Sequence, residues 1–365
     1  MPKRRTAEEA EQPDEVTEAL FDLAVKHVRA ASVGSASLLQ KKMKLGFVRA
    51  SRLFDLLVER GVLAQDVTLC DHKGRRFLVA SGERDDAPVE RPIRPILPAV
   101  EIAKDSHTKR ILGIPDLHSP YVDPQGIAII LALLKHPPHD KPWDLIFLFG
   151  DIHDFYQVSH FDQNPERLND LQQELDQTWG LLLSIREAAP RVKIEAVVGN
   201  HEGRLDRCIT RNAPALKSLR TNSLKTQLHL DELGIHMSPP KKPFMLTPNF
   251  RMTHGAGPND DGCKYSQFSA YSARYNLEKF WARGCSAHTH RAGAYFRTHS
   301  GQTDYWLECG CLCDRAKVSD DYATEANWQS GFAIFYQIED RVHGSLIPIE
   351  QGECVVEGKT YHAKG

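Results

Sequence analysis

The fold is decided by residues 143–154, which read WDLIFLFGDIHD. The first half, Trp143–Phe149, is a short and strongly apolar run, which is typical of a buried strand. The second half, Gly150–Asp154, changes abruptly to glycine, aspartate and histidine. Loops at strand ends bring polar groups together while the sheet holds them rigid. This junction is therefore the first candidate for a functional site.

Apolar and amphipathic segments alternate on both sides of this junction. Strands are expected at Arg110–Ile114 and Val192–Val198, helices at Gln125–Lys135 and Leu168–Ala188, and strands of a second sheet at Gly331–Ile338 and Val342–Ile349. Alternating strands and helices indicate an α/β fold with layered sheets.

Five short polar stretches follow strand-like runs or lie in loops. They are Asp116-Leu117-His118, Gly150-Asp151-Ile152-His153-Asp154, Gly199-Asn200-His201-Glu202, Thr253-His254-Gly255 and His288-Thr289-His290. A single Asp-x-His or His-x-His is a weak signal, and a lone Gly-Asp or Gly-Asn-His is more often a turn. The order and chemistry of all five stretches together favour metal binding. Divalent ions such as Mn²⁺, Fe²⁺ and Zn²⁺ accept imidazole and carboxylate ligands together.

We expect these side chains to hold two divalent ions, which need a bridging oxygen donor, and Asp151 is the candidate bridge. One ion is expected to take Asp116, His118, Asp151 and His290, and the other Asp151, Asn200, His254 and His288. A hydroxide between the two ions is expected to be the nucleophile that attacks a phosphoester. No covalent enzyme intermediate is then needed.

Two further residues are candidates for catalysis. His201 is expected to hold the phosphate and to protonate the leaving oxygen, because histidine can supply a proton near neutral pH. Asp154 is expected to accept a ring N–H from a nearby histidine and to fix the orientation of that ring.

The neighbouring residues allow weaker expectations. His153 and His160 are expected at the surface. Arg204 and Arg207 follow the Gly-Asn-His-Glu stretch at helical spacing, which suits a phosphate clamp or a solvent-facing role equally well. The segment Arg204–Phe244 is expected to form a cap over the site.

The complete set resembles the calcineurin-like metallophosphoesterase superfamily, whose pattern is D-x-H, G-D-x-x-D, G-N-H-[DE], H and then G-H-x-H. The resemblance covers about residues 110–350 and departs at Ala287, where the family usually has glycine. It implies a two-sheet metallophosphoesterase sandwich flanked by helices, with two metal ions (Mn as first choice; Fe, Zn or Ni as alternatives). The stretches Glu308–Asp314 and Asn327–Phe332 resemble those of phage and prophage members.

Residues 14–80 are interpreted as a separate small domain. A helical period begins at Asp14, further helices are expected at Ser35–Lys44 and Phe47–Glu59, and strands at Val67–Cys70 and Arg76–Ala80 flank a turn. Three helices followed by a hairpin are the layout of a winged helix. Leu20–Val79 resembles the gamma domain of the DNA translocase FtsK, which has such a fold. The family tends to have asparagine where Val48 stands, so its target sequence does not carry over, because valine cannot make the bidentate contact to adenine.

The charge of this domain favours DNA as its partner. Residues 26–84 contain twelve Lys or Arg against five Asp or Glu, a net charge of +7 in a chain whose total is −2. A basic face suits DNA phosphates, although a solvated surface or a protein-docking module is the alternative. The candidate DNA contacts are Lys41, Lys42, Lys44, Arg49, Arg52, Lys73, Arg75 and Arg76.

The remaining segments complete the expected domain plan. Residues 1–13 are expected to be a disordered tail, 81–109 a proline-rich linker, 110–352 the phosphoesterase domain and 353–365 a C-terminal tail. The sequence has no apolar run of the length that spans a membrane and no secretory signal. Its eight cysteines lack a secreted-scaffold pattern, so we expect a cytoplasmic location in a bacterial host or phage-infected cell.

These features together predict a DNA-associated, metal-dependent phosphodiesterase, most simply a nuclease. A phosphatase acting on phosphoproteins or small nucleotides, tethered to DNA, is the alternative with the same chemistry. A non-catalytic DNA-binding regulator is the alternative from another class.

Overall fold

The computed structural model describes residues 16–31, 33–70, 76–80, 108–160, 170–256, 261–319 and 326–364. The chain divides into two compact units, Met1–Glu101 and Ile102–Gly365. The tail expected at residues 1–13 and most of the linker expected at 81–109 lie outside the described residues. In the described part of the chain, no helix has both the length and the apolar character needed to cross a membrane.

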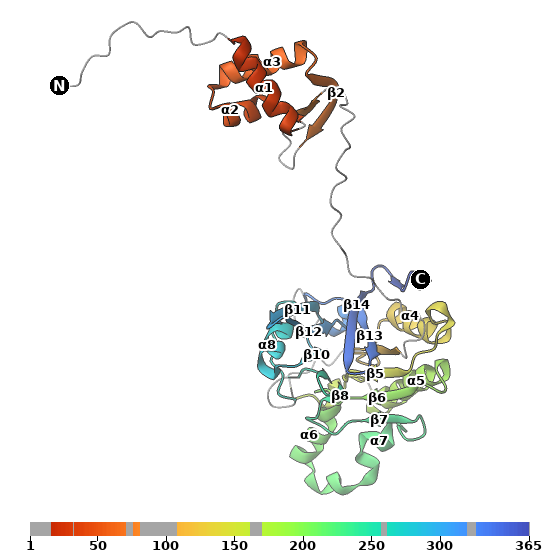
Figure 1. The fold of residues 1–365 in the computed structure, drawn as a ribbon. Coiled ribbons are helices and arrows are strands. Elements are labelled where there is room, and N and C mark those ends of the chain that lie inside the picture. Colours follow the sequence, from red (N-terminus) through yellow and green to blue (C-terminus); the bar gives the residue numbers. More distant parts are fainter. Residues whose placement is uncertain are drawn as a thin grey trace, which may run out of the picture. The chain divides into compact units, whose positions relative to one another are not determined.

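The first unit packs three helices on a small antiparallel sheet (Figure 1). The elements are α1 (Glu18–Ala31), β1 (Val33–Gly34), α2 (Ala36–Met43), α3 (Phe47–Glu59), β2 (Leu63–Cys70) and β3 (Arg76–Ala80), with strand order β1-β3-β2. Its core is built from one apolar side of each helix, including Ala24, Leu39 and Leu53, none of which is exposed to solvent. The three expected helices and the hairpin are present, and β1 is a strand that the sequence did not indicate.

The second unit contains a six-stranded and a five-stranded sheet. The first sheet has the order β14 (Arg341–Pro348), β13 (Gly331–Ile338), β4 (Lys109–Ile114), β5 (Leu145–Leu148), β6 (Lys193–Ala196) and β7 (Ile235–Met237). The second has the order β11 (Ala292–His299), β12 (Gln302–Cys309), β10 (Arg283–Ser286), β9 (Phe250–Thr253) and β8 (Phe244–Thr247). Strands β4 to β7 run parallel to one another, as do β9, β10 and β12.

Helices lie between the strands of this unit in the sequence. They are α4 (Pro124–Lys135), α5 (Leu171–Ala188), α6 (Glu202–Asn212), α7 (Leu224–Gln227), α8 (Tyr271–Phe280) and α9 (Arg315–Ser319), with short 3₁₀ turns η1 (Pro138–Asp140), η2 (Tyr156–Val158), η4 (Pro214–Ser218) and η5 (Arg220–Asn222). Figure 1 shows α4 and α5 beside the six-stranded sheet and α8 beside β10, β11 and β12.

The two faces of the central strands have different partners because successive side chains of a strand point to opposite sides. Ile146 and Leu148 belong to the apolar cluster formed with α4 and α5. Phe147 belongs to the second cluster, where it meets Phe250 of β9 and Cys285 of β10. The apolar run of β5 is therefore buried on both sides, between a helical layer and the second sheet.

The C-terminal segment corrects one expectation. We expected a tail from residue 353, but β15 (Glu353–Val356) and β16 (Lys359–His362) form an antiparallel hairpin. Its alternating apolar residues face the helical side of the sheet, so that Tyr361 is only 6% exposed. The Tyr361 hydroxyl donates a hydrogen bond of 2.7 Å to the carbonyl of His136, at the end of α4. A short alternating pattern thus becomes a strand pair because α4 offers it an apolar surface.

Candidate metal centre

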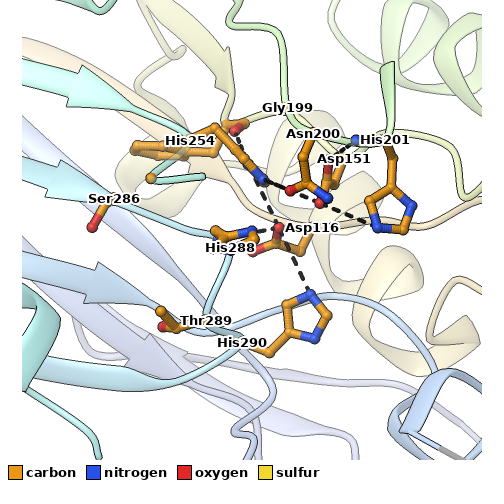
Figure 2. Close-up of polar contacts among 12 residues, drawn as sticks. Asp116, Asp151, Gly199, Asn200, His201, His254, Ser286, His288, Thr289 and His290 are labelled. Atoms are coloured by element: carbon orange, nitrogen blue, oxygen red, sulfur yellow. Dashed lines mark hydrogen bonds and ion pairs between the residues drawn. The ribbon is translucent and has the colours of Figure 1, made fainter. Parts of the chain in front are cut away.

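The candidate ligands lie at the carboxyl ends of five strands. Asp116 and His118 follow β4, Asp151 follows β5, Asn200 follows β6, His254 follows β9, and His288 and His290 follow β10. Parallel strands place their carboxyl ends along one edge of a sheet, where polar loops meet. Figure 2 shows that side chains from both sheets turn toward one another there. All seven sequence-predicted ligands are therefore brought into one region.

The loops that carry these ligands adopt an uncommon backbone conformation. Five of the seven have a positive φ: Asp116 (32°), His118 (45°), Asp151 (47°), His288 (68°) and His290 (56°). Non-glycine residues rarely adopt this region, and such strain concentrates at functional sites. At Gly199 an added Cβ would lie 2.2 Å from Asp151 Oδ1, so only glycine allows these two loops to meet.

The first group of ligands consists of Asp116, His118 and His290. Their ligand atoms lie within 4.8 Å of one another. His118 Nδ1 donates a hydrogen bond of 3.0 Å to the Asp154 carboxylate, which leaves a lone pair on Nε2 of the neutral ring. That Nε2 lies 3.0 Å from Nε2 of His290. Two ring nitrogens and a carboxylate therefore converge in the manner of a metal-binding group.

The second group consists of Asp151, His254 and His288, again with ligand atoms within 4.8 Å. His254 Nδ1 donates to the carbonyl of Phe149 over 2.9 Å, because a carbonyl can only accept. The Nε2 lone pair of the neutral ring then faces Asp151 Oδ2 at 3.1 Å and Asn200 Oδ1 at 2.9 Å. Three electron-rich atoms so close together need a cation or an added ring proton between them.

Asp151 lies between the two groups. Its Oδ2 is 3.8 Å from His118 Nε2 and 3.1 Å from His254 Nε2, while Oδ1 accepts the backbone N–H of His201 at 2.9 Å. Burial raises the pKa of Asp151, but the charges of His201 and His254 outweigh burial and hold the pKa well below its usual value. Asp151 is therefore an anion in contact with both ligand groups, as a bridging carboxylate would be.

Burial and charge also perturb the other ligands. Burial raises the pKa of Asp116 to about 7, against the lowering effect of His254. Burial lowers the pKa of His254, but the Asp151 carboxylate outweighs it and raises the pKa to about 10. Burial lowers the pKa of His288 to about 3. Such strongly perturbed groups in one cluster mark a functional site.

His201 and Asp154 lie together beside the first group. His201 Nδ1 donates a hydrogen bond of 2.7 Å to the backbone carbonyl of Asp154 and lies 3.2 Å from Oδ1 of the same residue. The other ring nitrogen, Nε2, is 3.8 Å from Asp151 Oδ2. Asp154 thereby orients the rings of both His118 and His201. Burial lowers the pKa of His201, against the raising charge of Asp151.

Glu202 is a residue whose role the sequence did not reveal. Its buried carboxylate accepts three backbone N–H groups, from Gly199 at 2.6 Å, Asp151 at 2.9 Å and Ile152 at 2.7 Å. It therefore joins the loop after β5 to the loop after β6. The acidic residue after Gly-Asn-His was the only signal for this role.

His153 corrects a second expectation. We expected it at the surface, but it is fully buried, because Ser119 and His153 form a β-bridge that draws the loop inward. Its ring centroid lies 3.7 Å from that of Phe155, and burial lowers the pKa of His153 to about 3. His153 is therefore a neutral packing residue.

Five of the seven ligands line a cavity of about 490 Å³, namely His118, Asp151, Asn200, His288 and His290. His160, Arg204 and Arg207 also line this cavity. Arg204 is 5% exposed and donates to the Asp154 carbonyl at 2.9 Å. Within the segment expected as a cap, residues 204–244, these two arginines are the ones that line the cavity.

Aromatic side chains flank the ligands on two sides. The ring of Tyr265 lies 5.0 Å from that of His288, and the ring of Trp328 lies 4.3 Å from that of His290, both edge to face. Tyr265 and Trp328 also line the cavity. Neither residue was predicted from the sequence to lie at the site.

The basic residues of the first unit are partly described. Lys41, Lys42 and Lys44 at the end of α2 are exposed, as is Arg52 of α3, and Arg49 is half-buried. Arg52 shares its side of α3 with Val48, which is 64% exposed. Lys73 and Arg75 lie outside the described residues, and Arg76 begins β3.

Some known proteins are similar to the first unit alone, and others are similar over a longer span of the chain. Residues 15–79 match the family model of the FtsK gamma domain. This stretch is similar to the DNA translocase SpoIIIE of Bacillus subtilis (41% identity over 56 residues) and to the DNA translocase FtsK of Leptospira interrogans (40% over 65 residues). The matches cover 15% and 18% of this chain, but only 7% and 6% of the translocases. The first unit therefore resembles one small domain of much longer proteins.

Two phage proteins are similar over a longer span. The Gene 54 proteins of Mycobacterium phages D29 and L5 are 26% identical to this chain over 266 and 265 residues. Each match covers 70% of this chain and 99% of the phage protein. A span of that length exceeds the first unit, Met1–Glu101, so it must include much of the second.

Proposed function

We propose that this protein is a DNA-associated, two-metal phosphodiesterase, most simply a nuclease. The proposal depends on one observation above all. Two groups of ligands, Asp116/His118/His290 and Asp151/His254/His288, lie at adjoining strand ends, and all of them are buried except the half-buried His288. Asp151 is in contact with both groups. Mixed imidazole and carboxylate sets of this kind suit Mn, Fe, Zn or Ni.

The residues present fit such a pair of ions. His118 and His254 each use Nδ1 to donate to a fixed acceptor, so each Nε2 offers its lone pair to the centre. Asn200 adds an amide oxygen beside His254. When bound, two metal ions supply an activated water and neutralise the charge of the phosphate oxygens.

The protein's own groups would orient the phosphoester and handle the proton. Arg204 and Arg207 border the cavity and offer positive charge to a phosphate. His201 is held by its Nδ1–H, so a proton on Nε2 is the one available to a leaving oxygen. Asp154 keeps this ring and that of His118 in place.

The first unit supports DNA as the associated polymer. Its exposed lysines and Arg52 lie at the end of α2 and on α3, where a basic face can contact phosphates. The similarity to the FtsK gamma domain and to DNA translocases points to the same partner. Tethering would raise the local concentration of phosphodiester bonds around the second unit.

One assay tests the proposal. The full chain, loaded with Mn²⁺, is incubated with end-labelled single- and double-stranded DNA, and in parallel with bis-p-nitrophenyl phosphate and the p-nitrophenyl monoester. We expect cleavage of DNA and of the diester, both lost in Asp151→Asn. The matched control is Asp231→Asn, since the Asp231 side chain is 77% exposed and pairs with Lys225 at the surface.

The outcomes separate the candidate functions. Turnover of the monoester without cleavage of DNA would support the phosphatase alternative. No turnover of any ester by protein that contains bound metal would contradict the enzymatic proposal and leave a DNA-binding regulator.

A further inference from the structure

Four aromatic side chains lie at the surface within residues 265–275, and the first of them, Tyr265, lines the cavity. Tyr265, Phe268, Tyr271 and Tyr275 are 56%, 67%, 49% and 38% exposed. The ring centroids of Phe268 and Tyr271 are 5.6 Å apart, and those of Tyr271 and Tyr275 are 6.5 Å apart. Tyr265 reaches the cavity itself and packs on the His288 ring. We call these four residues the aromatic platform.

The backbone beneath the platform is held firmly. The buried carboxylate of Glu308 accepts the N–H of Ala273 at 2.7 Å and that of Ala270 at 3.3 Å. Ser272 Oγ accepts the N–H of Ser266 at 2.9 Å, and Asn276 Oδ1 accepts that of Lys264 at 2.7 Å. The rings are therefore exposed on a fixed scaffold and are not the ends of a loose loop.

Positive charge accompanies the rings. Lys264 precedes Tyr265, and Arg274 lies between Tyr271 and Tyr275; both are exposed. In residues 264–280, all of which are described, Glu278 is the only acidic residue, and Arg274 pairs with it at 3.0 Å. The cavity that the platform adjoins is bordered by Arg204 and Arg207. An anionic polymer with flat apolar groups matches this combination of rings and cations.

We propose that the aromatic platform stacks the unpaired bases of a single-stranded nucleic acid, whose phosphodiester bond lies in the cavity. Exposed aromatic rings stack bases regardless of sequence, because every base has a flat π face. A base pair inside a duplex hides both faces against its neighbours, so the platform favours single strands and frayed ends. This inference rests on the proposed function and adds the class of substrate.

The position of the platform argues for the substrate as its occupant. Tyr265 contacts His288, a proposed metal ligand, and also forms part of the cavity wall. A ligand that lies on the platform and also reaches the cavity must have flat groups linked covalently to the phosphodiester in the cavity. A polynucleotide meets this requirement, because consecutive bases and phosphates alternate along it.

Photochemical crosslinking of the full chain tests the inference without requiring turnover. A single-stranded oligonucleotide containing 5-iodouracil is irradiated with the protein in EDTA, and the adducts are mapped by mass spectrometry. We expect adducts within residues 264–276, in addition to adducts in the basic first unit. An abasic strand of equal length keeps the phosphates but lacks the bases. We expect it to compete at the first unit but to compete about tenfold or more weakly at the platform.

Variants supply a second measurement. In Phe268→Ala/Tyr271→Ala, we expect the ratio of kcat/KM for a single-stranded oligonucleotide to that for bis-p-nitrophenyl phosphate to fall about tenfold or more. The matched control is Phe296→Ala, because Phe296 of β11 is 60% exposed and its ring packs on Tyr305, outside the platform. We expect this control to leave the ratio unchanged.

Failure of this inference differs from failure of the proposed function. Adducts confined to residues 16–80 would overturn the proposed base-stacking role of the platform even if DNA is cleaved. Equal competition by the abasic strand at the first unit and at the platform would overturn it too. A protein partner that covers residues 264–276 and excludes the oligonucleotide from them would overturn it as well. Absence of all ester turnover would contradict the proposed function, and the crosslinking result would still decide whether bases lie on the platform.

Discussion

Nε2 of His118 and Nε2 of His290 lie 3.0 Å apart, although one residue follows a strand of the six-stranded sheet and the other a strand of the five-stranded sheet. His118 uses its Nδ1–H for Asp154, so its Nε2 presents a lone pair to the neighbouring ring. A shared cation satisfies both nitrogens, and through them it would join the two sheets.

Metal binding should therefore stabilise the fold. We expect Mn²⁺ to raise the midpoint temperature of thermal unfolding. The unfolding free energy should increase by about 2.7 kcal/mol when the concentration of the free ion is 100 times its Kd. Differential scanning calorimetry with Mn²⁺ and with EDTA measures this difference. His290→Ala should abolish most of it, whereas His343→Ala, at an exposed position of β14, should retain it. Equal stabilisation of both variants would mean that the ion binds elsewhere.

Glu202 should govern the affinity for metal without being a ligand. In Glu202→Gln, an amide NH₂ replaces one of the oxygens that accept the N–H groups of Gly199, Asp151 and Ile152. An unsatisfied buried N–H costs about 1–3 kcal/mol of unfolding free energy. We also expect metal affinity to fall about 10- to 100-fold. Isothermal titration calorimetry and urea unfolding measure the two effects.

The matched control for this change is Glu232→Gln, because Glu232 is 73% exposed and contacts only His229 in the described structure. The control should match the parent protein in both measurements. If Glu202→Gln binds Mn²⁺ as tightly as the parent, the role assigned to its carboxylate is wrong.

Glu174 of α5 should make stability depend on pH. Burial raises its pKa from 4.5 to about 7, against the lowering effect of the Phe155 N–H. Between these values the folded protein holds a proton that the unfolded chain has lost, so this contribution to stability falls as pH rises. Glu174→Gln removes the titration. Its unfolding free energy relative to the parent should rise from pH 5 to pH 8, by up to about 3 kcal/mol.

Urea unfolding at both pH values checks the direction. Glu187→Gln, at an exposed position on the same helix, should show no such change relative to the parent. A relative loss of stability on going from pH 5 to pH 8 in Glu174→Gln would reverse the assigned sign.

Arg52 should contribute to DNA binding through charge. Arg52→Ala removes an exposed cation from α3, so we expect weaker binding of duplex DNA and a salt slope reduced by about one unit. Fluorescence anisotropy at several salt concentrations measures both quantities. Arg29→Ala removes another exposed arginine, from α1, and should change both quantities less. Equal effects of the two variants would indicate non-specific attraction to the whole unit.

The C-terminal hairpin should be an integral part of the second unit. Tyr361→Ala removes a buried ring and its hydrogen bond to His136, so we expect a loss of about 3 kcal/mol in unfolding free energy. Val355→Ala, on the same hairpin but 54% exposed, should cost far less. Chemical denaturation of both variants tests this. No loss in Tyr361→Ala would restore the interpretation of residues 353–365 as a tail.

The sequence predicted those parts of the molecule whose pattern is local. The strand Gly331–Ile338 and the helix Phe47–Glu59 have the bounds expected from their apolar periodicity. The expectation that Gly331–Ile338 belongs to a second sheet was wrong, because this strand pairs with Lys109–Ile114 in the six-stranded sheet. The candidate ligands could be named because each follows a strand-like run with a sharp change to polar residues. The structure adds that Asp116 and His290, far apart in sequence, have side-chain atoms 3.9 Å apart.

The missed features depend on tertiary contacts. No residue of the strand Ala292–His299 is buried, and the strand has no long apolar run, so its conformation comes from pairing with Gln302–Cys309. The burial of His153 follows from a bridge to Ser119, and a polar residue in a loop gives no sign of it. The role of Glu202 requires three N–H groups from two loops, which only the folded chain brings together.

Anomalous X-ray diffraction from crystals grown with Mn²⁺ shows directly whether two ions bind at the candidate metal centre. We expect two peaks about 3.5–4 Å apart. One should lie within ligand distance of Asp116, His118 and His290, the other of Asn200, His254 and His288, with Asp151 coordinating both. The absence of peaks among these side chains, with Mn²⁺ bound elsewhere or not at all, would contradict the two-metal proposal.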